Sequence, residues 1–487
     1  MKILLASSEV HPYSKTGGLG DMVAALAKAL AREGHQVGLV TPLYAGIRER
    51  FSELKPFDWV LNLPLGGRRI QGKVCTLEPV AGLTIYFIDQ PEFYLRPGIY
   101  QNGGVDYHDN AERFVFLSKA VVHLARHLPW RPEVVHVHDW QAGLVPLLIK
   151  HEKSAGRWAN APHACVTIHN LSYQGLFPVT KFPLTNLPWN YFNPEGVEFY
   201  GQLSCLKAGI VFADVVTTVS PRYAREITTP ELGCGLDGLL RQRQRQRQRE
   251  LSGILNGVDY DEWNSSDDPF IKHAYSAENL TGKAANKAEL QRELGLPVNE
   301  TIPLFGSINR LVEQKGVDIQ LTALEEMLGA EMQFILLGSG EAKYEEGYRD
   351  LARRHPAKVA VRIGHDQGLS HRIEAGCDFF LLPSRFEPCG LNQMYSLRYG
   401  TVPIVRATGG LDDTVVDIIE NAENANGIKF TNFSPAALAK AIRKALALYA
   451  EPELHRHYQR NGMAADFSWE RTARVYSDLY QKVIRDP

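Results

Sequence analysis

The sequence carries little surplus charge, few cysteines and no long hydrophobic run. Its 53 Lys and Arg residues nearly balance 55 Asp and Glu residues, and the formal net charge of −2 argues against nucleic acid or an anionic membrane as the main partner. No apolar segment approaches the length of a membrane-spanning helix, and the first residues lack the apolar core of a signal peptide. We therefore expect a cytoplasmic protein with no nucleic-acid or membrane partner.

The cysteines form no pattern that indicates a metal centre or a disulfide framework. The sequence has six of them, with no Cys-x-x-Cys pair and no tight cluster. A Gly-Lys-Ser/Thr sequence is absent as well, which excludes a Walker phosphate loop. The class that remains is an ordinary globular protein of a reducing compartment.

A glycine-rich loop stands near the start of the chain. The apolar run Lys2 to Ala6 is followed by Lys-Thr-Gly-Gly-Leu-Gly-Asp at 15 to 21 and then by an Ala/Leu-rich helical pattern. This order predicts a strand, a loop and a helix whose free N–H groups bind an anion, with Lys15 adding charge. The third glycine of a dinucleotide fingerprint would fall at Val23, so that motif is excluded. The loop predicts a nucleotide or phosphorylated ligand, and a tight turn with a surface lysine is the alternative.

The length of the chain and its alternation of strands and helices predict two domains. A chain of 487 residues exceeds the size at which a single core keeps growing. Apolar runs alternate with helical patterns throughout, which is typical of a doubly wound parallel sheet occurring twice. We place the linker near 256–259. An apolar stripe of helical spacing at 475–483 predicts a helix that could pack on one domain or on the other. The expected strands are 37–42, 83–89, 133–138, 164–168, 214–219, 303–308, 332–338, 358–363, 379–382 and 402–405.

Polar residues follow two expected strands of the first half. The segment His136-Val-His138-Asp139 ends one strand, and His169 ends the next. Residues two apart on a strand face the same side, so the two histidines with Asp139 are candidates for a metal site. Structural histidines beside one functional Asp139 are the interpretation that we favour, because no further ligand cluster is evident.

Cations, a carboxylate and a second glycine pair follow the strands of the second half. Arg310 and Lys315 provide fixed positive charge that could neutralise a diphosphate leaving group. Glu387 lies on a turn next to Pro388, and the Gly-Gly pair at 409–410 could donate N–H groups to phosphate. An exposed cation pair and a surface or capping carboxylate are the alternatives.

An Arg-Gln repeat occupies residues 241–249. It could form a basic patch for an anionic partner, but low-complexity runs are usually solvated, and both residue types favour helices. We expect a solvated loop or a helix extension.

Taken together, these motifs resemble those of the bacterial glycogen synthase and plant starch synthase family. They occur in family order between Lys2 and Asp417, and although each is weak alone, the seven in order are specific. The motifs are Lys-x-Gly-Gly-Leu, His-Asp-Trp-Gln, Ile-His-Asn-Leu-x-Tyr-Gln-Gly, Leu-Asn-Gly-Val-Asp, Gln-Lys-Gly, Phe-Glu-Pro-Cys-Gly-Leu and Thr-Gly-Gly-Leu.

The resemblance implies an α/β protein of the GT-B fold, with two Rossmann-like domains facing a central cleft. The implied domains are 1–255 on the acceptor side, 256–468 on the nucleotide-sugar side, and a helix at 469–487 that returns to the first. The implied reaction transfers glucose from ADP-glucose to the 4-hydroxyl at the non-reducing end of glycogen or another α-1,4-glucan, with retention of configuration. Neither a metal nor a cofactor is implied.

The resemblance also implies roles for residues that match the motifs. Arg310 and Lys315 bind the diphosphate, His169 contacts the transferred glucose, and Asp139 lies near the reacting centre. The implied catalytic residues are Glu387, Arg310, Lys315, His169 and Asp139. The implied substrate-binding residues are Lys15, Gly17, Gly18, Asp21, Tyr94, Asn256, Cys389, Gly390, Leu391, Thr408, Gly409 and Gly410.

Two positions depart from patterns found among related transferases. Tyr395 stands where many retaining relatives carry a second Glu, which suits the synthases. His365 stands where bacterial synthases often carry an aromatic residue to stack on adenine, so another donor such as UDP-glucose stays open, as does a non-catalytic glucan-binding protein. Glu387 could act as a nucleophile, as in retaining glycosidases; we favour attack by the acceptor on the face that the leaving group vacates.

Overall fold

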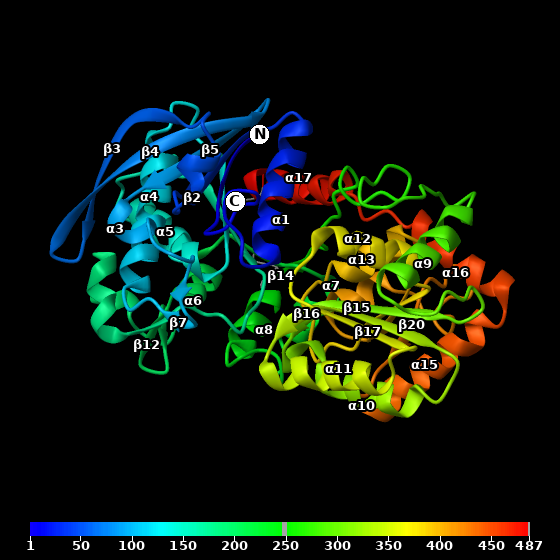
Figure 1. The fold of residues 1–487 in the computed structure, drawn as a ribbon. Coiled ribbons are helices and arrows are strands. Elements are labelled where there is room, and N and C mark those ends of the chain that lie inside the picture. The colour runs from blue at the N-terminus through cyan, green and yellow to red at the C-terminus, as the bar shows by residue number, and fades with distance from the viewer. Residues whose placement is uncertain (246–250, 486–487) are drawn as a thin grey trace. The chain divides into compact units, whose positions relative to one another are not determined.

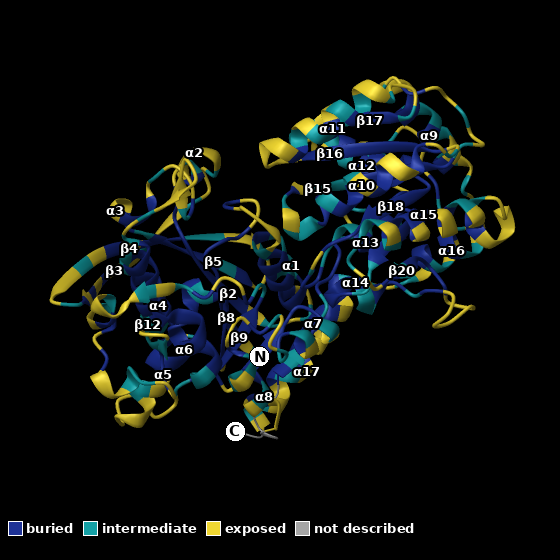
Figure 2. Ribbon diagram, turned by 90° about the horizontal axis from the view of Figure 1, so that it is seen from below, coloured by how far each residue is buried: buried dark blue, intermediate teal, exposed yellow. Residues whose placement is uncertain are grey.

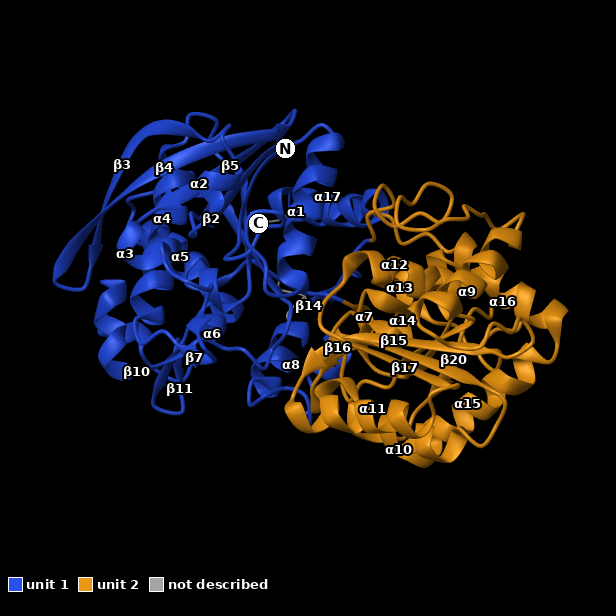
Figure 3. Cartoon of the chain, viewed as in Figure 1, with its two compact units in different colours: residues 1–219, 224–257, 469–487 blue, residues 220–223, 258–468 orange. Residues whose placement is uncertain are grey.

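The computed structural model describes residues 1–245 and 251–485 (Figure 1). The chain divides into two compact units (Figure 3). The first unit comprises Met1–Val219, Ala224–Gly257 and Trp469–Pro487, and the second comprises Ser220–Tyr223 and Val258–Ser468. Asn256, which the sequence analysis assigned to the second domain, therefore belongs to the first unit. Among the described residues no helix combines the length and the apolar character needed to span a bilayer.

The first unit contains a large sheet with helices packed against it. Its elements are β1 (Lys2–Ala6), α1 (Gly18–Arg32), β2 (Gln36–Pro42), α2 (Ile47–Arg50), β3 (Lys55–Leu65), β4 (Arg68–Val80), β5 (Leu83–Asp89), α3 (Pro91–Tyr94), β6 (Gln101–Asn102), β7 (Val105–Asp106), α4 (Asn110–His127), β8 (Val134–His138), η1 (Trp140–Ala142), α5 (Val145–Ser154), β9 (His163–Ile168), β10 (Leu176–Pro178), η2 (Val179–Thr185), η3 (Trp189–Tyr191), β11 (Glu198–Phe199), β12 (Gln202–Ser204), α6 (Cys205–Phe212), β13 (Val215–Thr218), α8 (Asp237–Arg245), β14 (Leu251–Gly253) and α17 (Trp469–Arg485). Helix α7 (Pro221–Glu226) contains the division between the units.

In the described part of this unit the sheet has the strand order β14-β13-β9-β8-β1-β2-β5-β4-β3. The strands from β14 to β5 are parallel, and β4 and β3 add an antiparallel edge. Strand β8 and strand β1 after its first residue are buried throughout, because structure covers both faces of a parallel sheet. This order brings the carboxyl ends of β1, β8 and β9 side by side, which is where α/β folds bind ligands.

The second unit is built on a parallel sheet with the strand order β17-β16-β15-β18-β19-β20 in the described residues. Its elements are α9 (Thr281–Glu293), β15 (Leu304–Leu311), η4 (Glu313–Lys315), α10 (Val317–Met327), β16 (Gln333–Gly340), α11 (Ala342–Arg354), β17 (Val359–Ile363), α12 (Gln367–Gly376), β18 (Phe379–Leu382), α13 (Asn392–Arg398), β19 (Val402–Arg406), α14 (Gly409–Thr414), β20 (Ile428–Phe430), α15 (Pro435–Tyr449) and α16 (Pro452–Ala464).

Alternate residues of the second sheet belong to separate apolar cores. Phe334 and Leu336 pack in one cluster, whereas Ile335 and Leu337 pack in another. Successive side chains of a strand point to opposite faces, so both faces of this sheet are covered. Figure 2 shows most of β16 and β18 in the colour of buried residues. The continuous apolar runs in the sequence therefore reflect burial on two sides.

Helix α17 packs in the first unit. It contacts α1, and its Tyr480 hydroxyl lies 2.7 Å from Nδ1 of His136 on β8. Tyr476 and Tyr480 are buried, but Val475 is 46% exposed, so the expected apolar stripe at 475–483 does not include Val475. Tyr476 and Tyr480 therefore lie on the buried face of the helix.

The Arg-Gln repeat is partly helical and partly buried. Residues 241–245 end α8, and the remaining 246–249 lie outside the described residues. Arg243 is only 3% exposed and donates hydrogen bonds to the carbonyls of Ile210 at 2.7 Å and Ala213 at 2.9 Å. It thereby satisfies carbonyl groups at the end of α6. Residues 241–245 thus form the helix extension that was one of the two expectations, but Arg243 is buried, because these carbonyls need a donor.

Candidate active site

The glycine loop of the first unit is organised around a buried carboxylate. Glu9, 3% exposed, accepts hydrogen bonds from the backbone N–H of Thr16 at 2.5 Å and of Gly17 at 3.2 Å. It also accepts from the Tyr100 hydroxyl at 2.6 Å. Glu9 thus occupies two N–H groups directly before Gly18, the start of the helix whose N–H groups are predicted to bind an anion. Glu9 was not among the predicted site residues, although a charged residue three positions after a buried strand is a signal that could have found it.

The charged residues of this loop pair with each other. Lys15 and Asp21 form an ion pair of 2.6 Å, with side chains 46% and 29% exposed, and α1 begins at Gly18. A pair this exposed is weakly stabilising and can exchange its partner for a ligand. The glycines at 17 and 18 have open space around them, so the loop leaves room beside Lys15.

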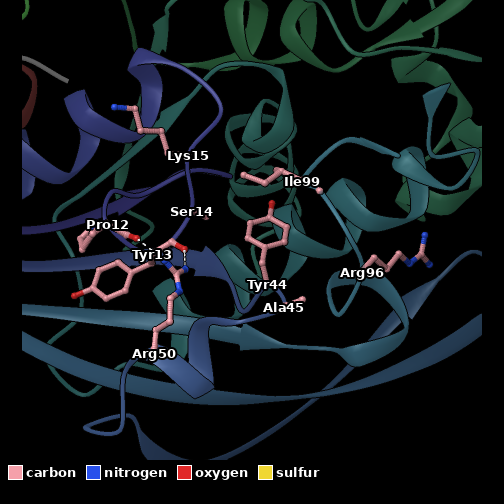
Figure 4. Close-up of a pocket in the computed structure, with 10 residues that line it drawn as sticks. Pro12, Tyr13, Ser14, Lys15, Tyr44, Ala45, Arg50, Arg96 and Ile99 are labelled. Carbon is pink, nitrogen blue, oxygen red and sulfur yellow. Dashed lines mark hydrogen bonds between the residues drawn. The ribbon is translucent and has the colours of Figure 1, made fainter. Parts of the chain in front are cut away.

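A pocket of about 330 Å³ lies beside this loop in the first unit (Figure 4). Lys15 and Arg50 contribute positive charge to its lining, and Arg50 also donates to the Tyr13 carbonyl at 2.6 Å. The other lining residues are Pro12, Tyr13, Ser14, Tyr44, Ala45, Arg96, Gly98 and Ile99. Tyr94 does not line it: this side chain is fully buried, and its hydroxyl donates to the Arg113 carbonyl at 2.8 Å. The prediction that Tyr94 binds substrate is therefore not supported, because its ring has no exposed surface.

Asp139 follows β8 in a strained conformation. Its φ of 55° and ψ of −169° lie in a region that is almost restricted to glycine, and such strain is concentrated at functional sites. Its carboxylate accepts the backbone N–H of His169 at 2.7 Å. Burial raises the pKa of Asp139 to about 7, backbone hydrogen bonds from 169 and 170 oppose the rise, and Glu9 adds to it. The ends of β1, β8 and β9 thus form one polar region.

The histidines of this region bind one another and nearby hydroxyls. Nδ1 of His138 lies 3.1 Å from Nε2 of His169. His136 has both ring nitrogens engaged, with Tyr480 at 2.7 Å and with Oγ1 of Thr167 at 2.6 Å. No group of three or more metal-ligating side chains is placed to hold an ion among the described residues. Because its nitrogens are already paired, His136 is better described as structural.

Asn256 is also a buried polar residue of the first unit. Its side chain is 7% exposed, and its Oδ1 has no hydrogen-bond partner among the described residues. A buried acceptor without a donor is costly unless a ligand or water supplies one. This observation agrees with the predicted contact between Asn256 and sugar hydroxyls.

In the second unit, Lys315 and Glu387 form an ion pair. Nζ of Lys315 lies 2.5 Å from Oε2 of Glu387, and their side chains are 21% and 10% exposed. The Ser384 hydroxyl donates to the same Oε2 at 3.1 Å. Gly316, with φ of 69°, brings the backbone after Lys315 so close to Pro383 that a Cβ would lie 2.1 Å from its carbonyl oxygen. The turn after β15 is therefore locked against the loop after β18.

The glycines at 409 and 410 support the loop that carries Glu387. A Cβ at Gly409 would lie 1.8 Å from the Glu387 carbonyl oxygen, and one at Gly410 would lie 2.1 Å from that of Cys389. The N–H of Gly410 lies 3.2 Å from the carbonyls of Glu387 and Pro388. The structure corrects the expectation that this N–H is free for phosphate, because the loop itself occupies it. The backbone N–H of Thr408 is likewise used, by the Arg406 carbonyl at 2.8 Å.

The other predicted residues of the second unit lie at the same edge of its sheet. Cys389 is buried, Gly390 has a φ of 73°, and Leu391 is the residue before α13. Arg310 is exposed near the end of β15. The structure thus joins Lys315, Glu387 and the glycine pair through direct contacts.

Comparisons with known proteins agree with these motifs. Residues 2–242 match the model of the starch synthase catalytic domain, and residues 288–464 match that of glycosyl transferases group 1. A glycogen synthase of Anaeromyxobacter dehalogenans (strain 2CP-1) is 49% identical over 483 residues, 99% of both chains. One from Myxococcus xanthus is 46% identical over 488 residues, 100% of both.

Solved structures give the same result. The catalytic domain of starch synthase IV from Arabidopsis thaliana, bound to ADP and acarbose, is 33% identical, with a TM-score of 0.88 over 99% of both chains. A sucrose-phosphate synthase from Thermosynechococcus elongatus, 18% identical with a TM-score of 0.60 over 100% of this chain and 99% of that one, shares the fold.

Two Rossmann-like sheets with these matches define a glycosyltransferase of the GT-B fold, as predicted. The chain belongs to the glycogen synthase and starch synthase family.

Proposed function

We propose that this enzyme transfers glucose from ADP-glucose to the 4-hydroxyl at the non-reducing end of an α-1,4-glucan, with retention of configuration. Full-length relatives that are glycogen synthases support the acceptor, and the starch synthase bound to ADP supports the nucleotide. The cytoplasmic location and the lack of nucleic-acid and membrane partners stay predictions from the sequence.

The observation that carries the proposal is the contact between Lys315 and Glu387. It joins the Gln-Lys-Gly and Phe-Glu-Pro-Cys-Gly motifs, 72 residues apart, into one charged centre. An ammonium group held there can move its interaction to a diphosphate as negative charge grows on the leaving group. Arg310, exposed near the end of β15, would supply a second cation with a planar, multidentate donor set.

The residues of the first unit would bind the sugar and the acceptor. His169 and Asn256 each offer a polar group to sugar hydroxyls, and Asp139 would lie near the acceptor. In the described part of the chain Lys15 pairs with partly exposed Asp21, so it can turn to the donor phosphates when substrate is bound. Binding energy from these contacts would exclude water and favour transfer over hydrolysis.

For retention, we favour attack by the acceptor on the face that the leaving group vacates. The bond from the acceptor O4 to C1 of glucose forms as the C1–O bond to the diphosphate breaks. The proton of the acceptor hydroxyl passes to a departing phosphate oxygen. Glu387, held by Lys315 and Ser384, would then stabilise the sugar electrostatically, and trapping of a covalent glycosyl-enzyme on Glu387 would refute this route.

The test is an incorporation assay with the purified protein. Radiolabelled ADP-glucose and UDP-glucose are each supplied with and without glycogen primer. We expect label from ADP-glucose to enter primer and to be lost on amylase digestion. Incorporation from UDP-glucose alone would make UDP-glucose the donor in place of ADP-glucose. Incorporation from neither would favour a glucan-binding protein without catalysis.

A further inference from the structure

His138 is fully buried at the end of β8, and within the described residues one of its ring nitrogens has no partner. Its Nδ1 lies 3.1 Å from Nε2 of His169, while its Nε2 has no hydrogen-bond partner among the described residues. The site described above makes no use of His138. Its hydrogen bond, however, determines where the proton of His169 resides.

Both rings are neutral at physiological pH. Burial lowers the pKa of His169 to about 3 and that of His138 well below its ordinary value. In a neutral pair joined by one hydrogen bond, one of the two facing nitrogens carries the proton and the other accepts it. The geometry therefore allows only two arrangements.

The unpartnered Nε2 of His138 distinguishes these arrangements. If His169 donated through Nε2, His138 would carry its own proton on Nε2, where the described residues offer no acceptor. If His138 donates through Nδ1, its Nε2 is an acceptor that lacks a donor. Buried N–H groups without an acceptor are rarer than under-used acceptors, so the second arrangement is favoured.

The surroundings hold the His138 ring in this orientation. The ring of His136 lies 4.2 Å from it, centre to centre, and is itself fixed by Tyr480 and Thr167. On the other side, Asp139 accepts the backbone N–H of His169 at 2.7 Å and fixes that residue's main chain. Turning either ring would break the hydrogen bond between Nδ1 of His138 and Nε2 of His169.

We propose that His138 is a positioning residue that holds His169 as the Nδ1–H tautomer, so that His169 offers a neutral hydrogen-bond donor to an oxygen of the transferred sugar. The sugar as the acceptor of this bond rests on the proposed function. A neutral donor is suited to a ring that gains positive charge in the transition state, where an imidazolium would repel it.

Two nearly isosteric substitutions test the proposal. In His138→Asn the amide N–H₂ can still donate to Nε2 of His169, whereas in His138→Leu no donor remains. We expect kcat/KM for the donor to fall roughly tenfold in His138→Leu, the loss of about one hydrogen bond, and to stay within about threefold of wild type in His138→Asn. Equal losses in the two variants, or none in His138→Leu, would overturn the proposal.

A spectroscopic measurement without substrate separates this inference from the proposed function. The ¹⁵N shifts of protein labelled at histidine report which ring nitrogen bears a proton, and the His169 signals are assigned by their absence in His169→Gln. We expect protonated Nδ1 in wild type, His138→Asn and Tyr480→Phe, and a mixture in His138→Leu. Tyr480→Phe controls for a general disturbance of packing, because of the three histidine rings the Tyr480 hydroxyl bonds that of His136 and neither His138 nor His169. Protonated Nε2 in wild type would refute the assignment even if glucosyl transfer is found, and failure of transfer would leave the tautomer result unaffected.

Discussion

Replacement of Lys315 by Met keeps the length of the side chain and removes its charge. If Lys315 stabilises the departing diphosphate, kcat falls by ~10²–10³, the usual cost of losing one preorganised electrostatic donor. KM for the glucan changes little, because the charge matters chiefly in the transition state. The assay is initial-rate kinetics at saturating ADP-glucose with the primer concentration varied, combined with urea unfolding.

The structure also predicts a loss of stability. Of the partners found in the described residues, the substitution leaves the Glu387 carboxylate, 10% exposed, with the Ser384 hydroxyl at 3.1 Å. Breaking a fully buried pair costs about 3–5 kcal/mol, and partial exposure of both side chains lowers this to roughly 1–3 kcal/mol. The double variant Lys315→Met/Glu387→Gln removes both charges, so we expect it to regain stability without regaining activity.

Lys287 provides a matched control in the same unit. It lies 2.7 Å from Asp378, with side chains 6% and 12% exposed, but outside the proposed site. Lys287→Met is expected to lose at least as much stability as Lys315→Met while kcat stays near that of wild type. The reasoning fails if Lys315→Met retains kcat within fivefold of wild type, or if the control loses kcat to the same degree.

Three further predictions concern stability, the Glu387 loop and the donor. The folded-state pKa of Asp139, about 7, exceeds its ordinary 3.8, so its contribution to stability is present below pH 3.8 and is lost as pH rises to 7. Over this range the free energy of unfolding of wild type should fall by about 1.4 kcal/mol per pH unit relative to that of Asp139→Asn. Parallel curves of unfolding free energy against pH would contradict this. Gly409→Ala places a Cβ against the Glu387 carbonyl and should lower kcat at least tenfold, whereas Gly329→Ala, with open space, should not; equal rates would refute the clash. His365→Tyr should lower KM for ADP-glucose about two- to tenfold through stacking without raising kcat, and an unchanged KM would place adenine elsewhere.

The sequence predicted the central strands because their burial is continuous. Strand β8 was expected at 133–138 and is observed at Val134–His138, and β18 coincides with its expected range. The long strands β3 and β4 were not among the expected strands. They form the antiparallel edge of the sheet, where exposed and buried residues mix. Pro56 and Pro64 lie within β3 and interrupt its apolar pattern in the sequence, so the strand signal is weak.

The positions of the candidate residues in the fold were easier to predict than their hydrogen-bond partners. The position after a parallel strand indicated Asp139, His169 and Glu387, because loops at that edge carry function in α/β folds. Which N–H groups are free was not predictable, since Glu9 and the Glu387 carbonyl occupy those of Gly17 and Gly410 only once the loops have folded. A glycine motif in a sequence shows that backbone approaches closely, and does not show what it approaches.

The same distinction applies to the His-x-His pattern. Its spacing places the two rings on one side of β8, and they do lie 4.2 Å apart, but the spacing is compatible with a metal site as well as with the structural pair that we favoured. The difference is made by Tyr480, which is 344 residues further along the chain and binds the nitrogen that a metal would need. With His136 occupied in this way, the hydrogen bond that the described residues provide for the His138 ring is the one to His169. A helix at the end of the chain therefore helps to set the hydrogen bonding of a residue that we place at the transferred sugar.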